Sequence, residues 1–346
     1  MNSIGRPILV GGRVEMGGRA DRLADVPSER ADGAHEGRAR HREAGVLGEL
    51  LRRQAALPPG HPSAPPDKSK RAREAEPSVR PDLDGQSNLA DAGERGFWSK
   101  VRRFEELWQA HLARWPDKQD KGAKPDRRDD PAGSWRGAGD RYLNPNENAE
   151  ADKQVDLLHG PEKAVTKLLM QIEHENPYGA VLVGLEHRHK GVDRIKEKIA
   201  DKMRFKDVNN AADAARTIND AVRYTFCLRA DEYVAGHAYV SRQLEAAGYR
   251  KAYGRNHWLD DPNYKGVNTR WVTADGGRFE LQFHTRESFY AKEHLTHAPY
   301  KRLRGLTASR AEQRELIAFQ REVSAAVPRP HDVSQIPNYN VRLKDG

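Results

Sequence analysis

One stretch of the chain alternates strictly between apolar and polar side chains: Arg278-Phe279-Glu280-Leu281-Gln282-Phe283-His284-Thr285. Successive side chains of a β-strand point to opposite faces. The apolar side chains are therefore predicted to face a core, while Glu280, Gln282 and His284 share the other face. A glutamate on such a face can line a cleft and take a proton from an attacking hydroxyl. The alternative is a half-exposed edge strand without chemistry.

Strands and helices are predicted to alternate on both sides of this stretch. A second strand, 267–273, is joined to it by the turn Ala274-Asp275-Gly276-Gly277, and further strands are expected at 181–190 and 221–228. Apolar residues at three- and four-residue steps predict helices after Gly160-Pro161 and over 192–203. Two more helices are expected, over 233–247, ending at Gly248, and over about 309–326, closed by Pro328. The alternation predicts an α/β (α+β) class, a sheet with helices packed on it.

The N-terminal part has a different composition. Residues 1–95 are dominated by Arg, Ala, Gly, Glu, Asp and Pro, and such a segment buries too little apolar surface to fold. One amphipathic helix is predicted over 97–115, with Val101, Phe104, Trp108 and Leu112 on one face. We therefore expect a mostly disordered leader over 1–150, a folded domain over 151–330 and a flexible tail over 331–346.

Charge and composition limit the kind of ligand and the compartment. Of the net charge of +8, six units lie in residues 151–346, which suits a nucleotide or nucleic acid, although a solvated basic surface would give the same count. The single cysteine excludes an intrachain disulfide and a multi-cysteine zinc site. The longest apolar run, 180–185, is too short to span a membrane. No secretory core follows the N-terminus, so the expected compartment is the cytoplasm.

A cationic cluster follows the strand predicted over 181–190. Arg188 and Lys190 are two apart and would share one strand face, while Lys190, Arg194 and Lys198 are spaced by four and would line one helix stripe. Cations that converge at a strand-to-helix junction can bind a triphosphate. The alternative is an ordinary solvated helix face, because acidic residues are interleaved.

Two further patterns fit nucleotide chemistry. Asp220 opens an apolar strand, where a carboxylate near a polyphosphate could hold Mg²⁺; a turn cap is the alternative. Tyr264-Lys265-Gly266 enters the next strand at Asn268, and an aromatic and a basic side chain beside a glycine can stack and approach a base. Alone, this last pattern is weak.

In their order and spacing, these patterns resemble the RelA/SpoT-type synthetase domain. That family presents Arg-x-Lys-x-x-x-Ser-x-x-x-Lys for the ATP phosphates, an Asp for Mg²⁺, a Tyr-x-x-[Ile/Leu]-His loop, and Glu-x-Gln-Ile-Arg-Thr with its catalytic Glu. The matching residues are Arg188, Lys190, Lys198, Asp220, Tyr264, Glu280, Gln282 and Thr285, and Glu293, His294, Tyr300 and Lys301 resemble the family's closing helix. The resemblance covers about two-fifths of the chain.

The resemblance implies a nucleotidyltransferase-like fold with a mixed five-stranded sheet, and a pyrophosphokinase that moves pyrophosphate from ATP to a ribose 3′-hydroxyl. Under it, Arg188, Lys190, Arg194 and Lys198 hold the ATP phosphates, and Asp220 with Glu280 holds Mg²⁺. Glu280 is the implied catalytic base. Acceptor contacts are implied for Tyr264, Lys265, Asn268, Gln282 and His284.

The chain also departs from the family pattern, chiefly at the acceptor positions. Arg194 replaces the motif Ser, Asn268 the loop His and His284 the motif Arg, while the Arg that follows the metal Asp is absent or displaced to Arg223. The acceptor is therefore open: GDP or GTP, ADP or ATP, or the 3′ end of tRNA.

The long leader before a C-terminal enzyme also resembles polymorphic toxins, which implies delivery into a target cell and an immunity protein as partner. The rival hypotheses are a catalytically inactive nucleotide- or RNA-binding module on the same fold, and a scaffold that works through its tails. The sequence does not indicate an oligomeric state.

Overall fold

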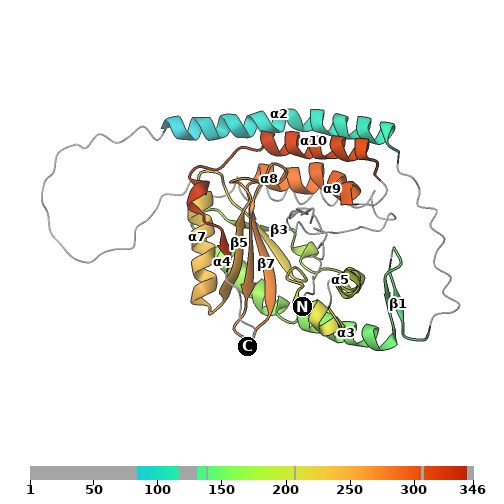
Figure 1. Ribbon diagram of the computed structural model, residues 1–346. Helices are drawn as coiled ribbons and strands as arrows, with labels where there is room; N and C mark the ends of the chain where they lie inside the picture. Colours follow the sequence, from blue (N-terminus) through green and yellow to red (C-terminus); the bar gives the residue numbers. More distant parts are fainter. Residues whose placement is uncertain (1–83, 117–130, 138, 206–207, 305–307, 341–346) are drawn as a thin grey trace, which may run out of the picture.

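The computed structural model describes residues 84–116, 131–137, 139–205, 208–304 and 308–340 (Figure 1). Most of the leader that was expected to be disordered lies outside these residues. The helices are α2 (Asp84–Arg114), α3 (Pro145–His159), α4 (Glu162–Glu175), η2 (Leu185–His187), α5 (Val192–Phe205), α6 (Ala211–Arg216), α7 (Tyr233–Ala246), α8 (Arg286–Tyr290), the π-helix η3 (Ala291–Thr296), α9 (His297–Arg304), α10 (Arg310–Ala326) and η4 (Val333–Gln335). The strands are β1 (Trp135–Arg136), β2 (Tyr142–Leu143), β3 (Val181–Val183), β4 (Arg223–Cys227), β5 (Arg250–Asn256), β6 (Val267–Val272), β7 (Arg278–His284) and β8 (Tyr339–Asn340).

A mixed sheet organises the fold, in the strand order β3-β4-β7-β6-β5-β8. β4 runs parallel to β7, and the other neighbouring pairs are antiparallel. The predicted strand around Glu280 is β7, and it lies inside the sheet, between β4 and β6. The mixed α/β class expected from the alternation of elements is thus confirmed.

The sheet has six strands rather than the five expected. The sixth, β8, pairs with β5 through Gly254 and Tyr339, and it belongs to the segment expected to be a flexible tail. The segment before β8 is anchored, because Val333 and Ile336 are buried in the core and their carbonyls both accept bonds from the Asn256 amide, at 2.8 and 2.9 Å. A short segment with isolated apolar residues gives no periodic signal, so the sequence could not predict this strand.

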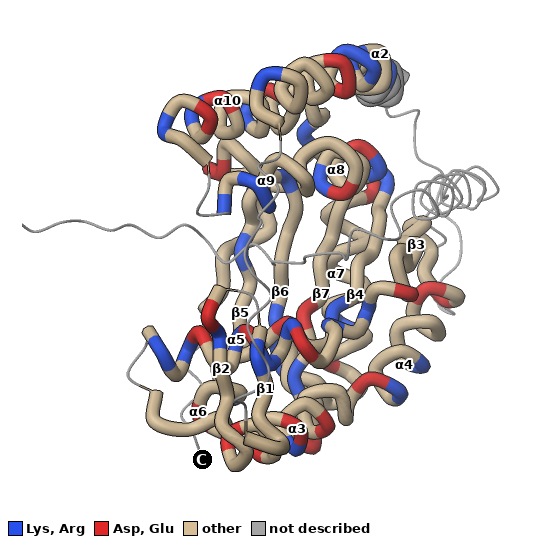
Figure 2. The backbone as a smooth tube through the Cα atoms, turned by 90° about the vertical axis from the view of Figure 1, so that its right-hand side faces the viewer, with Lys and Arg blue, Asp and Glu red and all other residues tan. Residues whose placement is uncertain are grey.

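The sheet has one apolar and one polar face. Phe279, Leu281 and Phe283 are all 0% exposed and join the main core, as the alternation predicted. α4 and α7 also contribute buried side chains to this core (Figure 1). Figure 2 looks onto the sheet with α8 and α9 above the strands and α5 below them. The polar side chains of β7 belong to the opposite face from the core.

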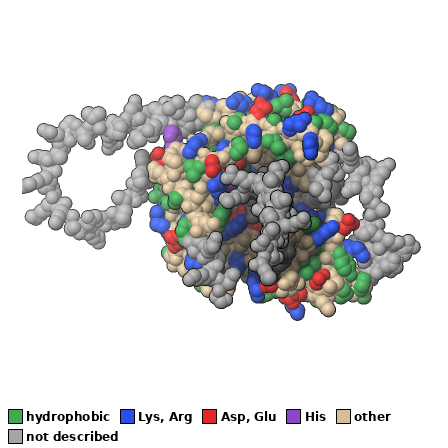
Figure 3. Space-filling view, viewed as in Figure 1, with side chains coloured by type: hydrophobic (Ala, Val, Ile, Leu, Met, Phe, Trp, Pro, Cys, Tyr) green, Lys and Arg blue, Asp and Glu red, His purple; other side chains and the backbone are tan. Residues whose placement is uncertain are grey.

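The helix predicted over 97–115 is α2, and it begins earlier, at Asp84. Phe97 and Phe104 are buried in the main core. α2 lies along α10 (Figure 1), where Arg103 pairs with Glu322 at 2.9 Å. Figure 3 shows basic, acidic and apolar side chains interspersed along this top edge. This part of the expected leader is therefore packed onto the folded domain.

The strand expected over 181–190 is much shorter, which corrects that prediction. β3 ends at Val183 because Gly184 adopts a left-handed conformation, with φ of 65°. The chain then forms the short helix η2 and touches the sheet again only through a bridge between His189 and Val222. Arg188 and Lys190 therefore do not lie on a regular strand.

A second, smaller core lies beside the sheet, formed mainly by α3, α5 and α6. Its buried residues include Val155, Ile195, Ile199 and Ala214. The domain boundary expected after residue 150 falls inside α3, whose capping box at Asn144 and Glu147 fixes its start. Within the described residues, we find no helix with the length and apolar character needed to cross a membrane.

Candidate active site

A buried carboxylate next to β4 is surrounded by lysines. Lys198 donates from Nζ to both carboxylate oxygens of Asp220, at 2.8 and 2.6 Å. Lys190 Nζ lies 3.4 Å from Asp220 Oδ2, and its side chain is only 1% exposed. Residues that the sequence suggested in two separate motifs, the two lysines in one and Asp220 in the other, therefore form one cluster.

Backbone hydrogen bonds place this cluster beside the strand that holds Glu280. The Lys190 amide donates to the Ala221 carbonyl, and the Arg223 amide donates to the Arg188 carbonyl, both at 2.9 Å. The Glu280 amide donates to the Val222 carbonyl, also at 2.9 Å. The segments of the lysines, of Asp220 and of Glu280 are thus adjacent.

The lysines keep Asp220 ionised. Burial by itself raises the pKa of Asp220, but the charges of Lys190 and Lys198, the Lys198 hydrogen bond and the charge of Arg223 lower it more. The net result is a pKa well below the usual range of an aspartate. At neutral pH the cluster therefore holds a carboxylate between cations.

The two arginines of the predicted phosphate motif pair with other carboxylates. Arg188 Nε donates to Glu162 Oε1 at 2.5 Å, at the start of α4. Arg194 pairs with Glu197 on its own helix. Of the four predicted phosphate ligands, the structure brings only Lys190 and Lys198 into contact with Asp220.

Glu280 lies on the polar face of the sheet and is 7% exposed. Its cross-strand neighbours are Arg223 on β4 and Arg270 on β6. Gln282 Nε2 donates to Glu280 Oε1 at 2.5 Å, and Gln282 Oε1 accepts from Lys292 Nζ at 2.9 Å. The carboxylate therefore has a fixed donor and lies in a row of cationic side chains.

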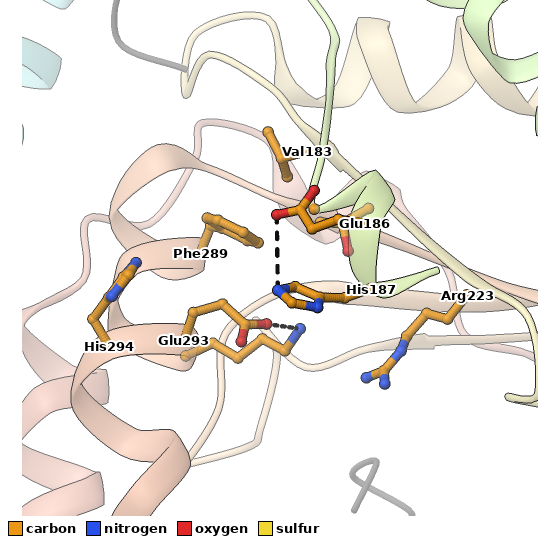
Figure 4. Close-up of a pocket in the computed structure, with 10 residues that line it drawn as sticks. Val183, Glu186, His187, Arg223, Phe289, Glu293 and His294 are labelled. Carbon is orange, nitrogen blue, oxygen red and sulfur yellow. Dashed lines mark ion pairs between the residues drawn. The ribbon is translucent and has the colours of Figure 1, made fainter. Parts of the chain in front are cut away.

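A pocket opens between η2, β4 and the turn of helix formed by α8 and η3 (Figure 4). Arg223 and Thr225 reach it from β4, while Phe289, Lys292, Glu293 and His294 line the helical side; Val183, Gly184, Glu186 and His187 complete the lining. Arg223 thus lies both in the pocket lining and next to Glu280 in the sheet. The pocket therefore adjoins the strand position of Glu280, but neither Glu280 nor Asp220 is part of its lining.

An ion pair lines one wall of this pocket. Lys292 Nζ lies 2.6 Å from Glu293 Oε1 (Figure 4). Burial raises the pKa of Glu293, but Lys292, His297 and Arg223 lower it more, so that it ends well below its usual range. Glu293 is therefore ionised at neutral pH.

Four of the five predicted acceptor contacts belong to a buried region. Tyr264 donates to Asn268 Oδ1 at 2.9 Å, and its hydroxyl also lies 2.9 Å from His284 Nε2. Tyr264 is 7% exposed and Gln282 and His284 are 0% exposed. The Tyr264 ring packs edge-on against the rings of His257 and His284. The structure therefore places Tyr264 inside the protein rather than as an open stacking surface.

The fifth predicted acceptor contact, Lys265, lies apart from this network. Its Nζ donates to the Asp261 carbonyl at 2.5 Å, within the same loop. Burial lowers the pKa of Lys265, and the charge of Asp261 opposes this. Gly266 permits the tight packing next to it, because a Cβ there would lie 2.9 Å from His284 Cε1.

Several residues of this region were not singled out by the sequence reasoning. Lys292 and Arg270 are single basic residues in a helix and in a strand. Such isolated basic residues are common on protein surfaces, so the sequence gives no motif that would distinguish them. Lys292 lies in η3, and π-helical turns are rare and often found at functional sites. Only the structure shows that these side chains reach the polar face.

The carboxylates suit a magnesium ion that is shared with a phosphate ligand. Within the described ranges, no group of three or more His, Cys, Asp or Glu side chains is arranged to hold a metal. Mg²⁺ commonly takes only one or two protein carboxylates together with substrate phosphates and water. Asp220 and Glu280 carry carboxylate oxygens on adjacent segments, and this is the donor type that such a site would use.

No protein-family model and no curated protein matches the chain. Several solved structures resemble it, among them the following three. A complex of the Type VI effector Tas1 with its immunity protein has 18% identity, covers 52% of this chain and 96% of its own, and gives a TM-score of 0.37. Small alarmone synthetase 1 from Bacillus subtilis, bound to its product pppGpp, has 13% identity, coverages of 51% and 90%, and a TM-score of 0.33. A GTP pyrophosphokinase family protein from Streptococcus pneumoniae has 15% identity, coverages of 52% and 89%, and a TM-score of 0.35. At scores of this size, fold and reaction have to be argued from the chain itself.

Proposed function

We propose that the polar face of the sheet binds ATP with Mg²⁺ and transfers its β,γ-pyrophosphate to a ribose 3′-hydroxyl. One observation carries the proposal: Lys190 and Lys198 converge on ionised Asp220 beside the strand of Glu280. Phosphoryl transfer needs cations and acidic metal ligands in one place, because catalysis rests on positioning and charge neutralisation. A solvated basic surface would not bury Lys190 and Asp220 together.

The lysines are the proposed phosphate ligands. In the structure, Lys190 and Lys198 balance the charge of Asp220. When ATP and Mg²⁺ bind, the phosphates would pair with the two lysines, and Mg²⁺ would pair with the Asp220 carboxylate. Arg188 and Arg194 are proposed as outer ligands, which would have to leave Glu162 and Glu197 to reach the phosphates. Each charge-assisted contact is worth about 1.5–3 kcal/mol.

Mg²⁺ is the proposed metal, held by Asp220 with Glu280. Bound there, it would neutralise charge on the phosphates during transfer. The protein's own part is to hold the two carboxylates on adjacent segments and to keep Asp220 ionised between Lys190 and Lys198. The Gln282 donor holds the Glu280 side chain toward the polar face.

Glu280 is the proposed base. Its carboxylate takes the proton of the 3′-hydroxyl, the freed oxygen bonds to the β-phosphorus, and the bond from that phosphorus to the α–β bridging oxygen breaks. AMP leaves with the electron pair of that bond. The products are AMP and an acceptor with a 3′-diphosphate.

The acceptor is either a guanine or adenine nucleotide or the 3′ end of tRNA. Because Tyr264, Gln282 and His284 are buried, we propose that the acceptor uses the accessible pocket side chains near Arg223 as well. Delivery into a target cell, with an immunity protein as partner, belongs to the same proposal. Its test is growth arrest on expression in a bacterium, which must be absent for Glu280→Gln.

The test of the reaction is a panel of acceptors. Full-length protein is incubated with labelled ATP, Mg²⁺ and GDP, GTP, ADP, ATP or tRNA. We expect AMP release with one class of acceptor, lost in Glu280→Gln. Nucleotide binding without turnover in every combination would support the inactive binding module, and no thermal shift with ATP would support the scaffold.

A further inference from the structure

Lys292 and Glu280 are connected through one buried amide. The Gln282 side chain is 0% exposed. Its Nε2 lies 2.5 Å from Glu280 Oε1, and its Oε1 lies 2.9 Å from Lys292 Nζ. A glutamine amide presents a donor at one end and an acceptor at the other, and rotation by half a turn exchanges them.

The two ends of this amide face groups that can each take only one hydrogen-bonding role, donor or acceptor. The Lys292 ammonium can only donate, and an ionised Glu280 carboxylate can only accept. In the reversed orientation the amide NH₂ would face an ammonium and its oxygen would face a carboxylate. One orientation is therefore strongly preferred, and it directs a donor at Glu280.

We propose that Lys292 is a positioning residue, which fixes the Gln282 amide so that its NH₂ holds the Glu280 carboxylate in place for proton transfer. The inference rests on the proposed function of Glu280 and adds a residue to it. Lys292 is supplied by the π-helix η3, which follows α8 directly.

Direct electrostatic action of Lys292 on Glu280 is the competing explanation. It is weakened by Glu293, whose Oε1 lies 2.6 Å from Lys292 Nζ, so the two opposite charges form a close pair. A close pair of opposite charges has a weak field at a distance. The two hydrogen bonds of the Gln282 side chain are short-range contacts, so the charge of Glu293 does not weaken them in this way.

The test is a double-mutant cycle in the full chain, with Lys292→Met, Gln282→Met and the combination. We expect each single variant to lower kcat for AMP release about 10- to 100-fold, since small displacements of a catalytic group cost this much. KM for ATP should stay unchanged, and Lys292→Arg should restore part of kcat. The combination should be no slower than Gln282→Met alone.

Additive losses in the cycle would overturn the proposal, because Lys292 would then act independently of the amide. The matched control is Lys251→Met, which removes a half-buried lysine that packs over the ring of Trp271 on β6. It should leave kcat unchanged. If Lys292→Met does not fold, Lys292→Arg and the Gln282→Met comparison still decide the question.

A second readout does not depend on activity. Hydrogen exchange of the Gln282 side-chain NH₂, followed by NMR and assigned by its loss in Gln282→Met, should be slow in the wild type and faster in Lys292→Met. Equal exchange in both would refute the positioning role. If the wild type releases no AMP with any acceptor, the proposed function fails, and the exchange rates alone decide whether Lys292 orients the amide.

Discussion

Replacing Asp220 by Asn tests whether the lysine cluster depends on one carboxylate. The substitution keeps the size of the side chain but removes its charge. Lys198 Nζ then loses two charge-assisted acceptors at 2.6–2.8 Å, and Lys190, 1% exposed, loses a carboxylate partner. We expect a marked loss of stability.

The size of the loss follows from burial. Removing one partner of a buried ion pair costs about 3–5 kcal/mol. The Lys198 side chain is 27% exposed and can turn to solvent, so we expect the lower end, about 3 kcal/mol. For a folded region of this size, this corresponds to a fall of roughly 6–12 °C in Tm.

Urea unfolding at pH 7 measures this loss, with Glu322→Gln as control. Glu322 pairs with Arg103 on the surface, where both side chains are about half exposed or more, so that variant should lose less than about 1 kcal/mol. The pKa of Asp220 is lowered in the folded state, so its contribution is present above about pH 4 and fades in stronger acid. An Asp220→Asn loss no larger than the control's would refute the buried cluster.

Three other substitutions test the fold. Phe97→Ala should cost about 3–5 kcal/mol in urea unfolding, because the ring is fully buried; a cost as small as that of exposed Leu107→Ala would show that α2 is not part of the core. Gly266→Ala should cost about 1–3 kcal/mol, because its Cβ would lie 2.9 Å from His284 Cε1, and an unchanged midpoint would contradict this packing. Burial lowers the pKa of His237 to about 3, so below about pH 6.5 only the unfolded chain gains this proton. At pH 5 this destabilises the fold by about 2 kcal/mol, and His237→Leu should flatten the stability profile between pH 6.5 and 5; parallel profiles would argue against a buried neutral histidine.

The sequence predicted those helices and strands in which apolar residues recur at a regular spacing. Strict alternation identified β7 with its core-facing residues, and three- and four-residue steps identified α2, α4 and α5. α7 and α10 were also expected, each with a Gly or Pro after its end. It did not predict β5, whose alternation is interrupted by Gly254, or β8, which has two residues. It also extended β3 past Gly184, because a single glycine does not reveal its left-handed conformation.

The site was predicted in part. The spacing of Lys190 and Lys198, and the place of Asp220 at the start of a strand, singled out residues that the structure brings into contact. The spacing of four also grouped Arg194 with these lysines, but on the helix surface it pairs with Glu197. Burial of Tyr264 depends on His257, which lies in the same connection between β5 and β6, and on His284 of β7. Contacts of this kind are tertiary, so local spacing could not indicate them.

The fate of the ATP phosphates tests the central claim most directly. Phosphorus NMR of a reaction with ATP, Mg²⁺ and the acceptor that releases AMP follows all of them at once. We predict that AMP appears together with an equal amount of a 3′-diphosphate on the acceptor, and that neither forms with Glu280→Gln. Conversion of ATP to ADP and phosphate, or product formation that survives Glu280→Gln, would contradict the account.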